Sequence, residues 1–169
     1  MTHNGLPEQL PGFDDPLGLL RACHDRMLAH CDLLERLAES PDSKVAQQVL
    51  RYFATSATQH HRDEEEDLFP LLNRQSMKIA DLIFALRREH AELDRLWSLI
   101  SPNLKKLPAG GVDDDTRAAI TAFCELCRNH IRRENREFLP LAASSLSSTQ
   151  LGIIGESMAK RRGVRYSAF

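Results

Sequence analysis

The sequence lacks the features that mark several large classes of protein. No apolar run approaches the roughly 18 residues of a membrane-spanning helix, and the N-terminus lacks the basic and then apolar segments of a secretion signal. The formal net charge of −2 offers nucleic acid no overall attraction. We therefore expect a cytoplasmic protein that has neither a membrane nor a nucleic acid as its partner.

Cysteine is also scarce, and its spacing argues against a thiolate metal site. The chain has four cysteines, which we expect to be free thiols in the cytoplasm: Cys23, Cys31, Cys124 and Cys127. The last two form a single CxxC, and the second such pair that a closed zinc site needs is absent from the sequence. Both lie in an apolar helical pattern, so we interpret them as small core residues.

Apolar residues recur at helical spacing through most of the 169 residues, and 42% of the chain is hydrophobic, as is usual for a globular domain. Asp15 and Pro16 are expected to open the first helix as its cap and first residue. Four long helices are predicted at about 15–40, 44–72, 77–100 and 113–140, with a loop over 101–113 and a short, frayed helix at about 150–161.

The predicted fold class is therefore all-α. We expect an up-and-down antiparallel four-helix bundle over residues 15–142, because the long amphipathic segments are joined by short breaks. An irregular lead-in over residues 1–14 would precede it, and a short C-terminal helix with a basic tail over 143–169 would follow it. Pro70 should fall in the last turns of the second helix and end or kink it.

One phrase occurs twice. Residues 60–70 read HHRDEEEDLFP and residues 130–140 read HIRRENREFLP. Each copy has a histidine, a glutamate four residues later, and then two apolar residues and a proline at the same offset. Because four residues make about one helical turn, the histidine and glutamate of each copy share a helix face. Such a face suits a metal held between helices.

The remaining histidines extend this pattern, because each predicted long helix carries at least one near its middle or in its second half. On the second helix, Glu64 projects between His60 and His61, at about 40° from the first on a wheel of about 100° per residue. That direction suits a carboxylate that bridges two ions. The predicted ligands of two metal ions are His24, His60, His61, Glu64, His90, His130 and Glu134.

This set leaves room for an oxo or hydroxo bridge and an open coordination position. His61 could instead orient a ligand or face water, whereas His30 is expected at the surface and His3 in the lead-in. Ligand type alone is compatible with iron, manganese, zinc or cobalt. No residue is assigned a catalytic role.

Other charged residues are expected to be solvated. Of the acidic residues around Glu64, one could orient a ligating histidine, as Glu89 could beside His90. The basic run near the C-terminus is interpreted as a solvated helix end that complements the helix dipole. The residues in question are Asp63, Glu65, Glu66 and Asp67 in the acidic group, and Lys160, Arg161, Arg162 and Arg165 in the basic run.

These motifs resemble the hemerythrin-like family, the histidine- and glutamate-rich cation-binding domains. The resemblance covers about residues 15–142 and rests on His24, both copies of the phrase, and the pair Glu89-His90. It implies a non-haem di-iron centre with two bridging carboxylates, so the expected cofactor is two iron ions, with zinc or manganese as substitutes. The oxygen-carrying members have two histidines one turn apart on the third helix. Here only His90 is present, and His61 could supply the missing nitrogen.

Three functions are compatible with this centre. We favour a module that binds oxygen, nitric oxide or iron for sensing, storage or detoxification, with a small diatomic ligand as its partner. The alternative is a di-iron oxidase or peroxidase that protects against oxidative or nitrosative stress, which turnover above that of free iron would reveal. The third is a structural protein with a vestigial site. The sequence is also compatible with a homodimer.

Overall fold

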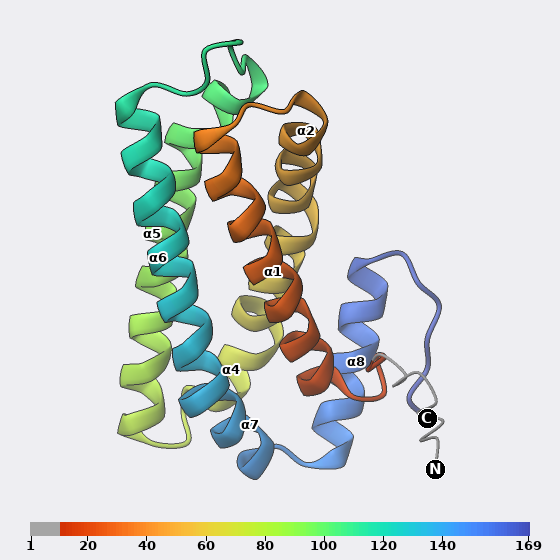
Figure 1. Cartoon of the computed structure of the whole chain (residues 1–169). Coiled ribbons are helices and arrows are strands. Elements are labelled where there is room, and N and C mark those ends of the chain that lie inside the picture. Colours follow the sequence, from red (N-terminus) through yellow and green to blue (C-terminus); the bar gives the residue numbers. More distant parts are fainter. Residues whose placement is uncertain (1–10) are drawn as a thin grey trace, which may run out of the picture.

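A computed structural model describes residues 11–169, and this part of the chain contains helices and loops but no strand. Long helices lie side by side, with a shorter helix, α8, against one of them (Figure 1). The predicted all-α class is therefore confirmed. His3 and residues 1–10 of the predicted lead-in lie outside the described residues.

The first helix, α1, begins where the sequence predicts. It spans Pro16–Glu39, and the Asp15 carboxylate caps it by accepting a hydrogen bond of 2.9 Å from the backbone N–H of Gly18. Pro16 has no N–H to leave unpaired in this first turn. The buried stripe of α1 carries apolar residues and His24.

The second helical segment runs to Leu72, as predicted, but it alternates between α-helical and π-helical turns. It comprises α2 (Ser43–Tyr52), η1 (Phe53–Ala57), α3 (Thr58–Arg62), η2 (Asp63–Leu68) and α4 (Phe69–Leu72). Pro70 lies two residues after the end of η2, where the backbone N–H of Phe69 donates to the carbonyl of Glu64, five residues back. The wider π turn accommodates the proline, whose ring would clash with a carbonyl in a regular α turn.

The third helix is longer than predicted. The α5 helix spans Met77–Lys105 and passes through Pro102, so the predicted end at residue 100 and loop over 101–113 are wrong. Ile100 and Leu104 lie one turn apart and are both buried, and this burial favours continuing the helix. Pro102 itself is exposed, and it removes only one backbone hydrogen bond.

The last long segment also extends further than predicted. It comprises α6 (Asp114–Arg133), η3 (Glu134–Phe138) and α7 (Leu139–Ser145), which runs past the expected end at Pro140. As at Pro70, a π segment precedes the proline. The α8 helix spans Ser148–Arg161, so it begins two residues before the expected Gln150. A capping box between Ser147 and Gln150 stabilises its start, although a frayed helix was expected.

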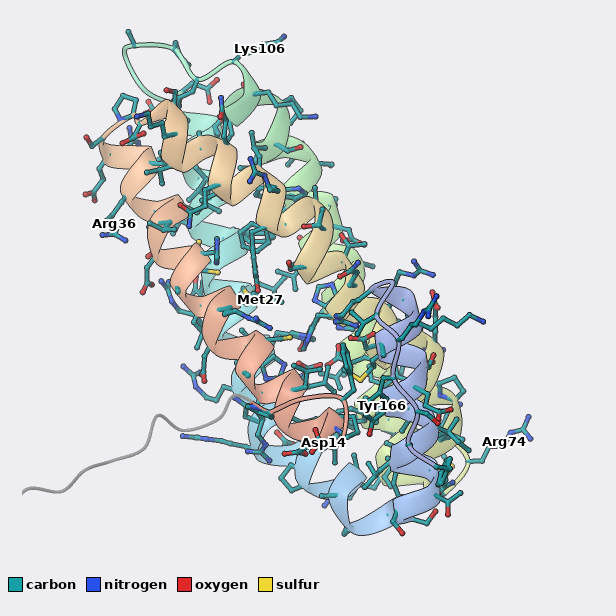
Figure 2. The ribbon with its side chains drawn as sticks, turned by 90° about the vertical axis from the view of Figure 1, so that its right-hand side faces the viewer. Asp14, Met27, Arg36, Arg74, Lys106 and Tyr166 are labelled. Atoms are coloured by element: carbon teal, nitrogen blue, oxygen red, sulfur yellow. The ribbon has the colours of Figure 1, made fainter. Side chains whose placement is uncertain are left out.

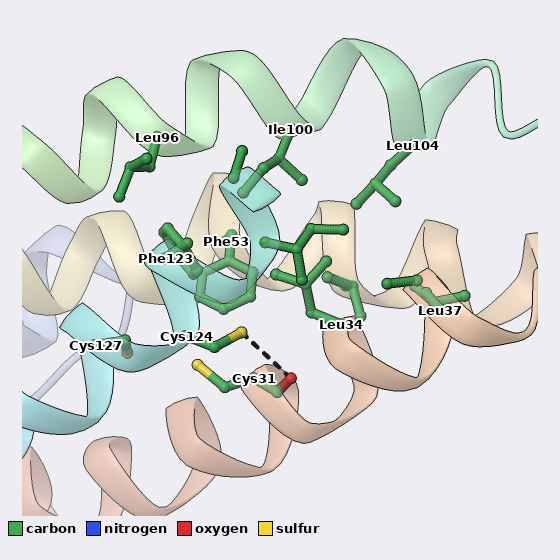
Figure 3. Packing of buried hydrophobic residues seen from close by; sticks show 14 of the residues in the cluster. Cys31, Leu34, Leu37, Phe53, Leu96, Ile100, Leu104, Phe123, Cys124 and Cys127 are labelled. Carbon is green, nitrogen blue, oxygen red and sulfur yellow. Dashed lines mark hydrogen bonds between the residues drawn. The ribbon is translucent and has the colours of Figure 1, made fainter. Parts of the chain in front are cut away.

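The helices pack around two apolar clusters at different levels. The α1 helix contacts α2 and α6, and α5 contacts the same two helices. The distal cluster, toward the end marked by Arg36 and Lys106 in Figure 2, includes Met27, Leu34, Phe53, Leu96, Ile100 and Phe123. Figure 3 shows part of it, with the Cys124 thiol directed at the backbone carbonyl of Cys31. The proximal cluster, toward Asp14 and Arg74, includes Leu20, Leu68, Phe69, Leu86 and Phe138.

All four cysteines are buried free thiols, in agreement with the expected thiol state and core positions. Among residues 11–169, no helix combines the length and the apolar character that crossing a membrane requires.

We predict that Leu34→Ala lowers the free energy of unfolding by about 2–5 kcal/mol, because Leu34 is fully buried in the distal cluster and its truncation leaves a cavity. Urea denaturation of the metal-free protein measures this. Leu99→Ala on the exposed face of α5 is the control and should change stability by less than about 0.5 kcal/mol. Equal midpoints for the two variants would contradict the packing described here.

Candidate metal centre

A layer of buried polar side chains separates the two apolar clusters. It contains six of the predicted ligands, each at most 5% exposed. The seventh, His61, is partly exposed, but its Nε2 atom is buried. The structure therefore brings together all seven predicted residues, which come from α1, α3, η2, α5, α6 and η3.

The layer has two groups of potential ligands. The first consists of His24, His60, Glu64 and Glu134, each offering one ligand atom within 4.8 Å of the others. The Nε2 atoms of His24 and His60 are 3.1 Å apart. Glu134 Oε2 lies 2.9 Å from His24 Nε2, and Glu64 Oε1 lies 3.3 Å from His60 Nε2.

The second group uses the same two glutamates with a different pair of histidines, His90 and His130. The Nε2 atoms of this pair are 3.2 Å apart. Glu64 Oε2 lies 3.3 Å from His90 Nε2, and Glu134 Oε1 lies 3.2 Å from His130 Nε2. His61 joins His90 and His130 in an overlapping group, and its ring stacks on that of His90 at 4.1 Å. Each glutamate thus directs one oxygen toward each histidine pair.

The carboxylates of this layer accept no hydrogen bond of good geometry, and their nearest polar neighbours are the histidine nitrogens at 2.9–3.3 Å. Both oxygens of Glu64, both oxygens of Glu134 and Nε2 of His61 are buried without such a hydrogen bond. A carboxylate in the interior is costly unless it is protonated, paired with a positive charge or bound to a cation. The donor set therefore fits metal ions placed among the imidazole nitrogens and the carboxylates.

Three of the histidines are oriented from behind by a side chain on a neighbouring element. The Nδ1 atom of His24 bonds to Asn135 at 2.7 Å, that of His90 to Glu65 at 2.8 Å, and that of His130 to Glu89 at 2.8 Å. Such contacts fix the ring and leave Nε2 free for a metal. Glu65 is therefore the acidic residue near Glu64 that was expected to orient a histidine. Glu89, which the sequence placed beside His90, orients His130 instead. Asn135 was not predicted.

The repeated phrase contained the signal for Asn135. Asn135 directly follows Glu134, just as Glu65 directly follows Glu64. Both residues orient a histidine of another helix, and they occupy equivalent positions in the two copies. Aligning the copies residue by residue would have pointed to both.

The prediction that the acidic residues around Glu64 and the basic C-terminal run are solvated is partly wrong. Asp63 is fully buried, and Arg161 and Arg162 bind it from α8 instead of forming a solvated helix end. Arg161 also binds Glu66 and Asp67. The arginines stabilise acidic residues next to Glu64, which the sequence pattern alone did not connect with the C-terminal helix. Arg165 is exposed, as expected.

Electrostatics within the layer favour charged pairs in the metal-free protein. Burial alone would lower the pKa of His60, His90 and His130, but the Glu64 and Glu134 carboxylates raise it, for His130 to about 10. Burial and the neighbouring imidazoles of His90 and His60 lower the pKa of His61 well below its usual range. His61 is therefore neutral, with a lone pair available for a cation.

A small apolar cavity of about 110 Å³ adjoins the layer on the side of His61. Its walls include Met27, Phe53, Ala57, Trp97 and Phe123. Thr58, His61 and Asp94 also line a surface hollow between α3 and α5, so the cavity and the hollow adjoin at these three residues. A molecule of a few atoms would have an apolar space beside the second histidine group.

Buried histidines and shared glutamates on packed helices are the features of a helical cation-binding protein. The model of the hemerythrin HHE cation-binding domain matches residues 15–142, and the chain belongs to this family. The chain is also 28% identical over 167 residues to an "Uncharacterized protein" of Haemophilus influenzae, a match that covers 94% of this chain and 96% of the relative. The protein is therefore a metal-binding protein.

We predict that the stability of the metal-free protein decreases with rising pH, whereas its affinity for metal increases. The imidazolium–carboxylate pairs of the metal-free protein contribute stability that is present below the ordinary histidine pKa of about 6.5 and is lost as the pH rises through the pKa of His130 at about 10. A metal needs these imidazoles without their protons, so binding releases protons and affinity increases with pH.

Calorimetric titration of Zn²⁺ in buffers of different ionisation enthalpy measures the proton release. His30→Ala is the control, because His30 lies outside the layer, stacked on Tyr52. This variant should release as many protons on metal binding as the wild type. A binding heat that is independent of the buffer would contradict this assignment.

Proposed function

We propose that this cytoplasmic protein holds a non-haem di-iron centre within an up-and-down antiparallel four-helix bundle and uses it to bind or sense oxygen, nitric oxide or iron. His24 and His60 would hold one ion, and His61, His90 and His130 the other. Glu64 and Glu134 would bridge the two. The observation that supports the proposal is the placement of these carboxylates, whose four buried oxygens each face a histidine nitrogen at 2.9–3.3 Å and are shared between two histidine groups.

Two ions fit this donor set better than one. The two groups share only the glutamates, and each has histidines of its own. One ion could engage one group, but it would leave imidazole nitrogens and carboxylate oxygens of the other group buried without partners. Two divalent cations would compensate the charge of both carboxylates and would bind the lone pairs of all five imidazoles.

Iron is the proposed metal because nitrogen and carboxylate oxygen ligands suit it and because the family resemblance implies it. Zinc or manganese could substitute in vitro, since the ligand set does not exclude them. When bound, iron supplies a change of oxidation state and an open coordination position for a diatomic ligand.

The cavity beside His61 supports a small, weakly polar ligand over a larger substrate. Its volume of about 110 Å³ holds only a few atoms, and most of its walls are apolar. The hydroxyl of Tyr52, a candidate proton donor for an oxidase, donates instead to the carbonyl of Cys23 at 3.4 Å. Turnover above that of free iron would support the oxidase or peroxidase alternative.

We predict about two irons per chain in protein that is purified aerobically after expression with ample iron. Elemental analysis with an absorption spectrum of the same sample measures this. Zinc alone, or no metal at all, would contradict the di-iron proposal.

Single substitutions separate the two ion positions. Glu64→Ala should weaken the binding of both ions, because its oxygens face both histidine groups, whereas His24→Ala should weaken mainly one. Titration with Co²⁺, followed by absorption and elemental analysis, measures both effects, and His30→Ala is the control. Equal losses of both ions in Glu64→Ala and His24→Ala would contradict the shared-carboxylate arrangement.

A further inference from the structure

The α8 helix lies beyond residues 15–142, which match the family model, yet it packs against the metal centre. It contacts η2 and α1, and it lies beside α1 in Figure 1. Its buried residues Ile154 and Met158 belong to the proximal cluster. Its polar contacts concentrate on η2, the π-helical segment that carries Glu64.

Two arginines at the end of α8 bind the acidic residues of η2. Arg162 makes two hydrogen bonds to the Asp63 carboxylate, at 2.6 and 3.1 Å. Arg161, only 8% exposed, binds Asp63 as well, and it reaches Asp67 at 2.9 Å and Glu66 at 3.1 Å. Ser157 adds a hydrogen bond of 2.8 Å to Asp67. Such paired, largely buried contacts between an arginine and carboxylates are strong and directional.

Asp63 is the centre of this network, and it directly precedes Glu64. Its side chain is fully buried, so it requires the opposite charges that Arg161 and Arg162 provide. The two neighbouring carboxylates point in different directions, that of Asp63 to α8 and that of Glu64 to the histidine layer. Fixing the first therefore fixes the rotation of η2 about its axis, and with it the direction of the second.

Glu64 needs such support because its buried carboxylate contacts the imidazoles of His60 and His90 at 3.3 Å, and bonds to a metal would replace these contacts. The second copy of the phrase has an equivalent support from another helix. Arg133, directly before Glu134, forms an ion pair with Glu89 of α5. In both copies, the residue before the shared glutamate is thus held by a charged partner from outside its own segment, but only the first copy uses the C-terminal helix.

We propose that Arg161 and Arg162 are positioning residues of the metal centre, which hold η2 so that Glu64 faces both histidine groups. The inference rests on the proposed function, because it assigns α8 a role in metal binding at that same site. It explains why Arg161 and Arg162 are turned toward η2, whereas Lys160 and Arg165 are exposed.

The test compares Co²⁺ binding by the full-length wild type, Arg162→Gln and Arg162→Lys, using the cobalt absorption spectrum as the signature of ligand geometry. We expect Arg162→Gln to bind Co²⁺ about 10–100-fold more weakly, with an altered spectrum, as is typical when a residue that supports a metal ligand is lost. Arg162→Lys keeps the charge and should recover part of the affinity.

Arg128→Gln is the matched control. Arg128 joins α6 to α1 through Glu35 at 2.7 Å and Asp32 at 2.8 Å, away from the histidine layer. Its loss should leave Co²⁺ affinity and the spectrum unchanged. Amide hydrogen exchange of the metal-free proteins provides a second measurement, in which residues 63–68 should exchange faster in Arg162→Gln and at the wild-type rate in Arg128→Gln.

The Co²⁺ measurements separate failure of the metal centre from failure of the role assigned to α8. If the wild type binds no Co²⁺ or iron, the proposed metal centre fails and this inference fails with it. If the wild type binds two ions and Arg162→Gln binds them with the same affinity and spectrum, only the positioning role of α8 is overturned. An equal loss of affinity in Arg128→Gln would also overturn it, because the effect would then reflect general stability.

Discussion

The constraint on which the rest of the structure depends is the burial of two carboxylates, Glu64 and Glu134, among five histidines. The apolar clusters on either side of this layer exclude water, so they make charge compensation necessary. In the metal-free protein, protonated histidines provide part of it, as the raised pKa of His60, His90 and His130 indicates. Bound cations would compensate the same negative charge by binding the unprotonated nitrogens. Protons and metal therefore compete for these nitrogens.

The local backbone conformation positions the two glutamates of this layer. Glu64 and Glu134 both lie in π-helical segments, each of which is followed by a proline two residues after its end. A π turn shifts the register of the side chains that follow, and such turns are frequent at functional sites. Charged partners then hold these segments from neighbouring helices, from α8 for the first and from α5 for the second. The layer is thus built by the predicted ligands together with the residues directly beside them in sequence.

Much of this was predictable from the sequence, and the exceptions have physical causes. The helices followed from apolar periodicity, and His60, His61, Glu64, His130 and Glu134 followed from the repeated phrase, because both depend on local spacing. His24 and His90 followed from their positions near the middle of the predicted helices. The extension of α5 past Pro102 did not, because the burial of Leu104 outweighed the local preference of proline. The pairing of Asp63 with Arg162 did not either, since nothing local links residues so far apart in sequence. Ligation by the seven residues stays a prediction.

The most direct test of the central claim is anomalous diffraction at the iron absorption edge from crystals of the iron-loaded protein. The account predicts two iron peaks per chain, one beside His24 and His60 and the other beside His61, His90 and His130. Glu64 and Glu134 should contact both. A single peak, or iron bound away from the two glutamates, would contradict it.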